Sequence, residues 1–140
     1  MFRELLIPVD LSDHNSIAFT ALRDVAAPGA SVELLHVIEQ ITREADPEVA
    51  AFYRALERKA REKLERWCEA LRKDGFAART HVCVGRRGAE VLRRASERRC
   101  EVILMASHAI TGPEAPLGTL SHQIAMLAPC SVLLVRTPTA

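Results

Sequence analysis

The feature that most constrains the fold of this 140-residue chain is a series of five short apolar or alternating segments. Between them lie stretches in which apolar residues recur at the spacing of a helix. Residues 5–9, 31–38, 101–106 and 131–135 are apolar runs that predict buried strands. Residues 78–84 alternate apolar and polar side chains, which is typical of a half-exposed strand near a sheet edge. Strands separated by helices are parallel and joined by right-handed crossovers. The pattern therefore predicts an open, doubly wound α/β sheet with helices on both faces.

The first two connections carry local signals for helices. Ser12 or Asp13 is placed to cap a first helix, which we expect to end at Pro28-Gly29. Asp46 and Pro47 open a long helix as N-cap and first helical residue, and Gly75 ends it. Apolar residues of the long helix recur at steps of three and four, so they form one continuous stripe.

The last two helices are shorter. One begins near Gly88 or Ala89, just after Arg86 and Arg87. Cations at a helix N-terminus oppose the helix dipole. The two arginines therefore lie outside the first turn or face an anion. The other helix covers residues 119–127, with Leu120, Ile124 and Leu127 directed inward.

Charge and composition exclude several classes of partner. The 19 basic and 18 acidic residues leave a net charge of +1, so we expect neither nucleic acid nor an anionic membrane as a partner. The arginines are mixed with glutamates, which indicates solvated helix faces. We find no secretory signal and no apolar run near the ~20 residues of a membrane span. We expect a single cytoplasmic domain over residues 1–140.

The cysteines and histidines form no ligand spacing. Scattered cysteines in such a domain are typically buried thiols that behave as small hydrophobes, the alternative being a regulatory disulfide. No Ser-His-Asp triad, carboxylate pair or metal pattern can be argued, so we predict no catalytic residue, no metal site and no enzyme activity. The four cysteines are Cys68, Cys83, Cys100 and Cys130.

A candidate binding site follows from the predicted fold. Open parallel sheets bind ligands beyond the carboxyl ends of their strands, where the strand order reverses. Asp10 follows the first strand, and Ser107 and His108 follow the fourth. Gly118-Thr119 begins a helix, whose free N–H groups favour anions such as phosphate. These residues are candidates for a nucleotide crevice.

Several segments of the chain resemble the universal stress protein (UspA-like) family. The end "ILMASHAITGPEAPLGTLSHQIAMLAPCSVLLVR" is similar to the family's glycine-containing loop, helix and final A-P-C-P-V-L-V-V strand. "LLIPVDLSDHNSIAFTAL", "VELLHVI" and "VCVGRRGAEVL" resemble its first three strands and the turns after them. The resemblance covers essentially the whole chain.

The resemblance implies a sheet of order 3-2-1-4-5, of the Rossmann-like, adenine nucleotide alpha hydrolase-like kind. It implies a homodimer and, in one branch, ATP binding through a G-x-x-G, nine-residue, G-[ST] motif. Asp10 aligns with a nucleotide-contacting residue, the alternative being that it caps the first helix or braces its turn. Val37 aligns with a residue that packs the adenine, the alternative being core packing.

The nucleotide motif is altered in this chain. Ala106 and Ala109 replace its two close glycines. Eight residues, instead of the motif's nine, separate Ala109 from Gly118. A Cβ blocks close approach of a phosphate and disfavours positive φ. Gly112 lies at a different position in the loop and would have to supply the flexibility of the two missing glycines. The sequence therefore favours a protein with a degraded ATP-binding motif.

Two functions remain open. The first is a dimeric stress-response regulatory protein that acts through an unknown protein partner. The second is a switch that holds ATP or AMP, and a weak ATP hydrolase is a more distant third. The final strand is apolar on both faces, and at a sheet edge it would pair with a second copy. The residues of this predicted dimer edge are Val132, Leu133, Leu134 and Val135.

Overall fold

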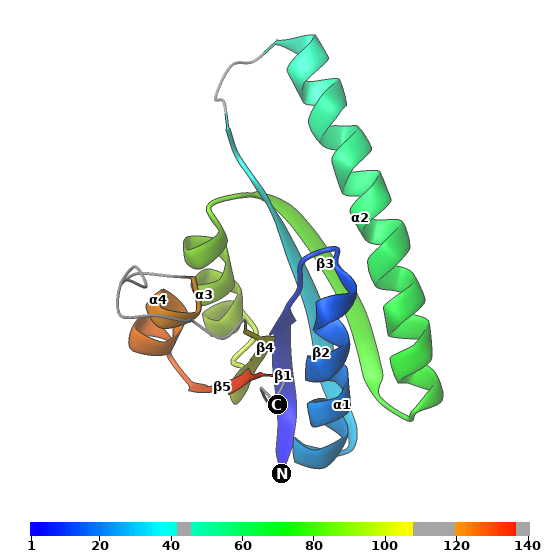
Figure 1. The fold of residues 1–140 in the computed structure, drawn as a ribbon, viewed down its shortest axis with the longest axis vertical. Helices are drawn as coiled ribbons and strands as arrows, with labels where there is room; N and C mark the ends of the chain where they lie inside the picture. Colours follow the sequence, from blue (N-terminus) through cyan, green and yellow to red (C-terminus); the bar gives the residue numbers. More distant parts are fainter. Residues whose placement is uncertain (42–45, 108–119, 137–140) are drawn as a thin grey trace.

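The computed structural model describes residues 1–41, 46–107 and 120–136. Ten elements follow one another along these residues (Figure 1). They are β1 (Phe2–Pro8), the 3-10 turn η1 (Asp13–Asn15), α1 (Ser16–Val25), β2 (Ala26–Glu39), α2 (Pro47–Lys73), β3 (Ala77–Gly85), α3 (Arg87–Glu97), β4 (Val102–Ala106), α4 (Leu120–Leu127) and β5 (Ser131–Val135).

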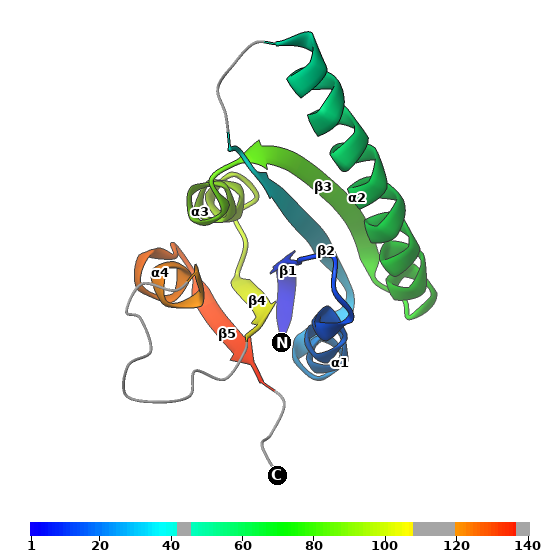
Figure 2. The same ribbon diagram turned by 45° about the horizontal axis from the view of Figure 1, so that its top comes forward.

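The five strands form one parallel sheet in the order β3-β2-β1-β4-β5. This confirms the predicted α/β fold, its strand order and the position of residues 78–84 at an edge. Figure 2 shows α1 and α2 on one side of the sheet and α3 and α4 on the other. The strand order reverses between β1 and β4, so their carboxyl ends form the switch point at which such sheets bind ligands.

Two apolar layers hold the helices to the sheet. Leu5 and Ile7 of β1 pack toward α1 and α2, and Leu64 belongs to the same cluster. Leu6 faces the opposite layer, where it shares a cluster with Ile124 of α4. Alternate residues of β1 thus supply both cores, which is why the strand reads as a continuous apolar run.

The start of β2 differs from the expected helix end. The first helix ends at Val25, and β2 begins at Ala26 and continues through Pro28-Gly29. The pairing register between β1 and β2 shifts at this point, and Gly29 has a φ of 72°. A glycine in this left-handed region is typical of a strand irregularity, so Pro28-Gly29 bends the strand instead of stopping the helix.

The long helix α2 has the predicted caps. The side chain of Asp46 accepts a hydrogen bond from the N–H of Glu48 at 2.8 Å, and Gly75 follows the helix with a φ of 96°. In Figure 1 the first turns of α2 extend beyond the sheet. On the stripe, Leu64 in the second half is fully buried, whereas Tyr53 and Leu56 in the first half are half-buried. The apolar stripe therefore packs closely only along the second half.

The other element bounds bring smaller corrections. The helix α3 begins at Arg87, earlier than expected, so Arg87 lies inside its first turn. In α4, Ile124 is fully buried as predicted, but Leu127 is 62% exposed and does not point inward. Leu127 is the last residue of α4, where the helix leaves the core. The strand β4 begins at Val102, and the Glu101 carboxylate accepts hydrogen bonds from two N–H groups of β1.

A buried ion pair links α3 to β2. Glu33 is 2% exposed and accepts two hydrogen bonds from the guanidinium of Arg94, at 2.7 and 2.8 Å. Arg79 of β3 lies 3.8 Å from the same carboxylate. The prediction of solvated arginines is therefore wrong for Arg94. It is right for Arg93, which is exposed and pairs with carboxylates of its own helix.

The cysteines are free thiols. Cys68 and Cys100 are buried, as predicted, whereas Cys83 and Cys130 are half-buried. Burial raises the pKa of Cys68 and Cys83 to about 11 and that of Cys100 to about 12. These thiols stay protonated at neutral pH, which keeps them poor nucleophiles.

The strand β5 occupies the edge opposite β3. Val132 and Leu134 pack against the α3 and α4 layer, and Leu133 and Val135 against the α1 and α2 layer. All four residues of the predicted dimer edge are half-buried. Their position at an edge is as predicted, and the dimer itself stays a prediction.

Candidate functional site

A cavity of about 100 Å³ opens at the switch point. Its wall combines the carboxyl ends of three strands with residues from the first turns of α3 and α4. The lining residues are Pro8, Val9, Asp10, Asn15, Leu35, His36, Val37, Arg87, Val91, Met105, Ala106 and Leu120. Typical small-molecule pockets hold roughly 300–1,000 Å³. The described residues therefore enclose room for only part of a nucleotide-sized ligand.

Asp10 lies in the cavity wall and also braces the turn after β1. Its Oδ1 accepts hydrogen bonds from the N–H of Ser12 at 2.8 Å, the hydroxyl of Ser12 at 2.6 Å and the amide of Asn15 at 2.8 Å. The bracing role weighed for Asp10 is confirmed. The turn also positions the carboxylate at the cavity, so one residue serves both the fold and the site.

Asn15 fixes this turn and was missed in the sequence. It is 4% exposed, and its side-chain amide also donates to the carbonyl oxygens of Asp10 and Ser12, each at 2.8 Å. Buried amides are costly unless they are paired, so these bonds hold Asn15 and the turn in one arrangement. Ser12 is the residue that caps η1, as the sequence allowed.

The strand β2 supplies the opposite wall. Val37 is 5% exposed and belongs to the core beneath α3 and α4, which confirms the core-packing alternative. It also lines the cavity, so contact with a ligand remains compatible with its place. His36 is buried beside it, and its Nδ1 lies 2.9 Å from the carbonyl oxygen of Val9. This contact ties β2 to the end of β1 at the cavity.

The residues after β4 divide into two groups. Ala106 lines the cavity, whereas Ser107 is buried beside it and donates its N–H to the Val135 carbonyl at 2.8 Å. Ser107 is therefore a link to β5 instead of a lining residue. The predicted residues His108, Gly118 and Thr119 lie outside the described residues, as do Ala109 and Gly112.

Arg87 is the functional candidate whose role the sequence left open. It is the first residue of α3, it is exposed, and it is one of the residues that line the cavity together with Asp10 and Val37. Its backbone N–H donates to a carboxylate oxygen of Glu39 at 3.1 Å. Glu39 thus supplies the negative charge that a helix N-terminus favours. The pair Arg86-Arg87 was the signal that could have identified it.

A second, shallower hollow adjoins the cavity and shares Arg87 and Leu120 with it. Gly88 and Gln123 meet in its floor. A Cβ built on Gly88 would lie 2.4 Å from Oε1 of Gln123, closer than real contacts allow. The end of the Gln123 side chain of α4 therefore rests against Gly88 in the first turn of α3 and would have to turn away from any larger residue there. The remaining lining residues are Glu39, Gln40, Arg86 and Ala89.

Two further properties concern the described residues alone. They contain no group of three His, Cys, Asp or Glu side chains arranged to hold a metal ion. Across the same ranges, 1–41, 46–107 and 120–136, no helix has the length and apolar character of a membrane span.

A parallel sheet of this order, with a cavity at its switch point, defines a Rossmann-like α/β protein. Residues 1–136 match the universal stress protein family, and the chain belongs to that family. This confirms the resemblance found in the sequence.

Individual relatives agree with this assignment. The universal stress protein YxiE of Bacillus subtilis is 28% identical, with 97% of this chain and all of the relative aligned. The structure of universal stress protein UspA from Lactobacillus plantarum has a TM-score of 0.75 and 20% identity, covering 97% and 99% of the two chains. A universal stress protein from Archaeoglobus fulgidus in complex with dAMP has a TM-score of 0.61 and 18% identity, covering 94% and 95%.

Proposed function

We propose that this universal stress protein is a regulatory protein that binds an adenine nucleotide in the cavity at the switch point. The observation that carries the proposal is the lining of that cavity. Val37, Val91 and Leu120 offer apolar surface for a base, and Asp10 offers a carboxylate for sugar hydroxyls. The dAMP complex of the Archaeoglobus relative, which shares the fold, supports an adenine nucleotide as the ligand.

The size of the cavity bears on which nucleotide is bound. The described residues enclose about 100 Å³, and Ala106 places a methyl group where the motif has its first glycine. Both features favour AMP over ATP. The cavity lining can contact a base and a sugar, whereas the Ala106 methyl group hinders close approach of a polyphosphate. Binding of AMP is thus compatible with both the altered glycine motif and the cavity at the switch point.

Calorimetric titration of the purified chain with AMP and with Mg-ATP tests the proposal. We expect AMP to bind with a dissociation constant well below about 1 mM, where the binding free energy is only ~4 kcal/mol. Ala106→Leu should abolish binding by filling the cavity, and Leu127→Ala, on an exposed side chain at the end of α4, serves as its control. Absence of both binding and co-purified nucleotide would refute the proposal.

The second candidate function is a nucleotide-independent interaction protein. The methyl group of Ala106 in the cavity wall is the observation that favours it. Ala106→Gly separates the two candidates, because it restores the first glycine of the motif. A gain of ATP binding in this variant, with none in the parent chain, would assign the parent to the second candidate.

We further propose a cytoplasmic homodimer formed along β5. The strand lies at a sheet edge with apolar residues on both faces, and exposed edges of this kind favour pairing. Met126 and Leu127, just before it in the chain, are 71% and 62% exposed. Light scattering should give a dimer mass, and Leu133→Lys should shift it to a monomer. A monomer of the parent chain at micromolar concentration would refute the dimer.

A further inference from the structure

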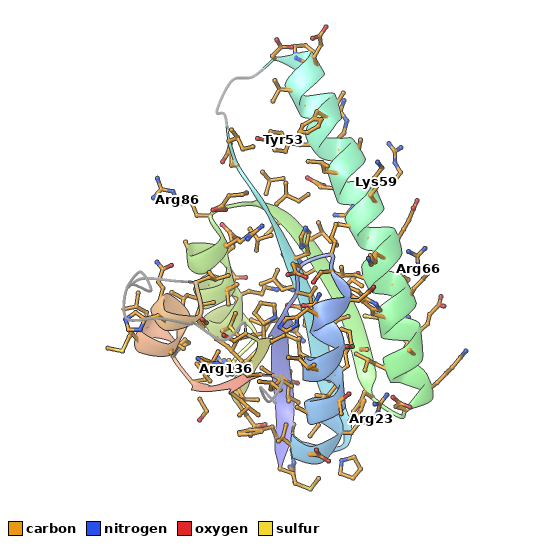
Figure 3. All side chains as sticks on the ribbon, viewed as in Figure 1. Arg23, Tyr53, Lys59, Arg66, Arg86 and Arg136 are labelled. Carbon is orange, nitrogen blue, oxygen red and sulfur yellow. The ribbon has the colours of Figure 1, made fainter. Side chains whose placement is uncertain are left out.

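Arg87 places a positive charge at a cavity whose other lining residues are mainly apolar, with the polar Asn15 and His36 and the carboxylate of Asp10. Its neighbour Arg86 is the N-cap of α3 and does not line this cavity. In Figure 3 the side chain of Arg86 projects away from the ribbon into open space. Two adjacent residues of the same charge thus have different surroundings, because Arg86 has an extended backbone at the N-cap whereas Arg87 is the first helical residue.

The other arginines within α3 have carboxylate partners. Arg93 pairs with Glu90 and Glu97 of its own helix, and Arg94 pairs with the buried Glu33. Among the described residues, the guanidinium of Arg87 makes neither a hydrogen bond nor an ion pair. Its backbone N–H is satisfied by Glu39, so the helix end itself has a partner and the side-chain cation does not.

We propose that Arg87 binds the phosphate of the nucleotide, so that the cavity selects phosphorylated nucleosides over uncharged ones. The inference rests on the proposed function and names the group that Arg87 recognises. A guanidinium binds a phosphate through two parallel hydrogen bonds, which makes arginine well suited to this anion. Asp10 would repel a phosphate and accept from hydroxyls, so the two charges orient the ligand with its sugar toward Asp10.

The hollow beyond Arg87 gives the phosphate a place. It shares Arg87 and Leu120 with the cavity and adds Arg86, Gln40 and Gln123 to its lining, together with Glu39, whose carboxylate accepts a hydrogen bond from the Arg87 N–H. A ligand whose base lies against Val37 would reach this hollow past Arg87. The phosphate then lies on the α3 side of the cavity, away from the altered glycine positions that begin at Ala106.

Calorimetry with AMP and adenosine, on the full chain, tests the role of Arg87. A charge-assisted hydrogen bond contributes enough that Arg87→Ala should weaken AMP binding by about 10- to 100-fold. Binding of adenosine should stay unchanged. Arg58→Ala removes the same charge from an exposed position on α2 that lines neither the cavity nor the hollow, so it should alter AMP affinity less than about 2-fold. Arg87→Lys should recover part of the loss.

The outcomes distinguish this inference from the proposed function. If the parent chain binds neither AMP nor adenosine, the proposed function fails and the inference falls with it. If the parent chain binds AMP and Arg87→Ala keeps that affinity, the inference alone is overturned. Equal losses for AMP and adenosine would also overturn it, because Arg87 would then contact the base or sugar. Circular dichroism and thermal unfolding of each variant confirm that it is folded.

Discussion

Arg87 and Arg94 lie seven residues apart on α3, which is about two turns, so their side chains leave the helix on nearly the same face. Arg94 lies over the sheet and makes two hydrogen bonds to the buried Glu33. Arg87 lies at the carboxyl ends of the strands and lines the cavity, and its guanidinium makes no ion pair to the described residues. One residue type on one helix face thus serves the fold at one end and is available to a ligand at the other.

The largest effect is expected at Arg94. Arg94→Ala should lower the free energy of unfolding by about 3–5 kcal/mol, because it leaves the Glu33 carboxylate buried without its main partner. Urea unfolding followed by circular dichroism measures this. Arg93→Ala is the control, since exposed ion pairs contribute at most about 1 kcal/mol. A loss at Arg94 no larger than that at Arg93 would remove the contrast between the two ends of α3.

The double variant Glu33→Leu/Arg94→Leu sharpens the same point. Replacing a buried ion pair by apolar side chains is often neutral for stability. We expect the double variant to be more stable than Arg94→Ala alone. If both variants are equally destabilised, the loss of unfolding free energy comes from the packing of Arg94 and not from the buried charge of Glu33.

An intermediate effect is expected at Asn15, which belongs to the fold and the site together. Asn15→Ala should cost about 1–3 kcal/mol of unfolding free energy, since it removes a buried donor from three acceptors. It should also weaken AMP binding, because the turn no longer fixes the Asp10 carboxylate. Thr20→Ala, an exposed position on α1, is the control for both measurements. Normal AMP affinity in the Asn15 variant would show that the turn does not position Asp10.

The sequence predicted the features that depend on neighbouring residues. The strand and helix pattern specified a parallel sheet, the caps at Asp46 and Gly75 were correct, and alternation identified β3 as an edge strand. Glu33 and Arg94 are 61 residues apart, and no local pattern connects them. Arg87 was ambiguous because its orientation depends on where α3 begins, and each residue of error rotates a side chain by about 100°.

A smaller effect concerns the pH dependence of stability. Burial, and then the charge of Arg94, lowers the pKa of His81 in the folded protein from 6.5, while Arg93, Glu33 and Glu97 also act on it. The unfolded chain therefore binds the proton first on acidification. Stability should be full above pH 6.5 and decline as the pH falls below it.

Denaturant unfolding between pH 7 and pH 5 measures this dependence. His81→Gln should reduce the slope of stability against pH relative to the parent chain, because the titrating imidazole is gone. His122→Gln, at an exposed position in α4, is the control. Identical slopes for the parent chain and the His81 variant would show that the imidazole does not resist protonation in the folded state.

The smallest change in stability is expected at Arg87. Arg87→Ala should alter the free energy of unfolding by no more than about 0.5 kcal/mol, since no ion pair to the described residues is lost. The same urea titration used for Arg94 measures it. A loss close to that of Arg94 would mean that the two arginines share one structural role.

The contact between Gly88 and Gln123 has a consequence for how this protein and its relatives can diverge. Because a methyl group at position 88 would meet the end of the Gln123 side chain at 2.4 Å, that flexible end must turn away in a chain with alanine there. A chain with alanine at the first site should carry a shorter or differently directed side chain at the second. Paired substitutions across related genomes would therefore trace where α3 and α4 touch, even in chains whose structures are unknown.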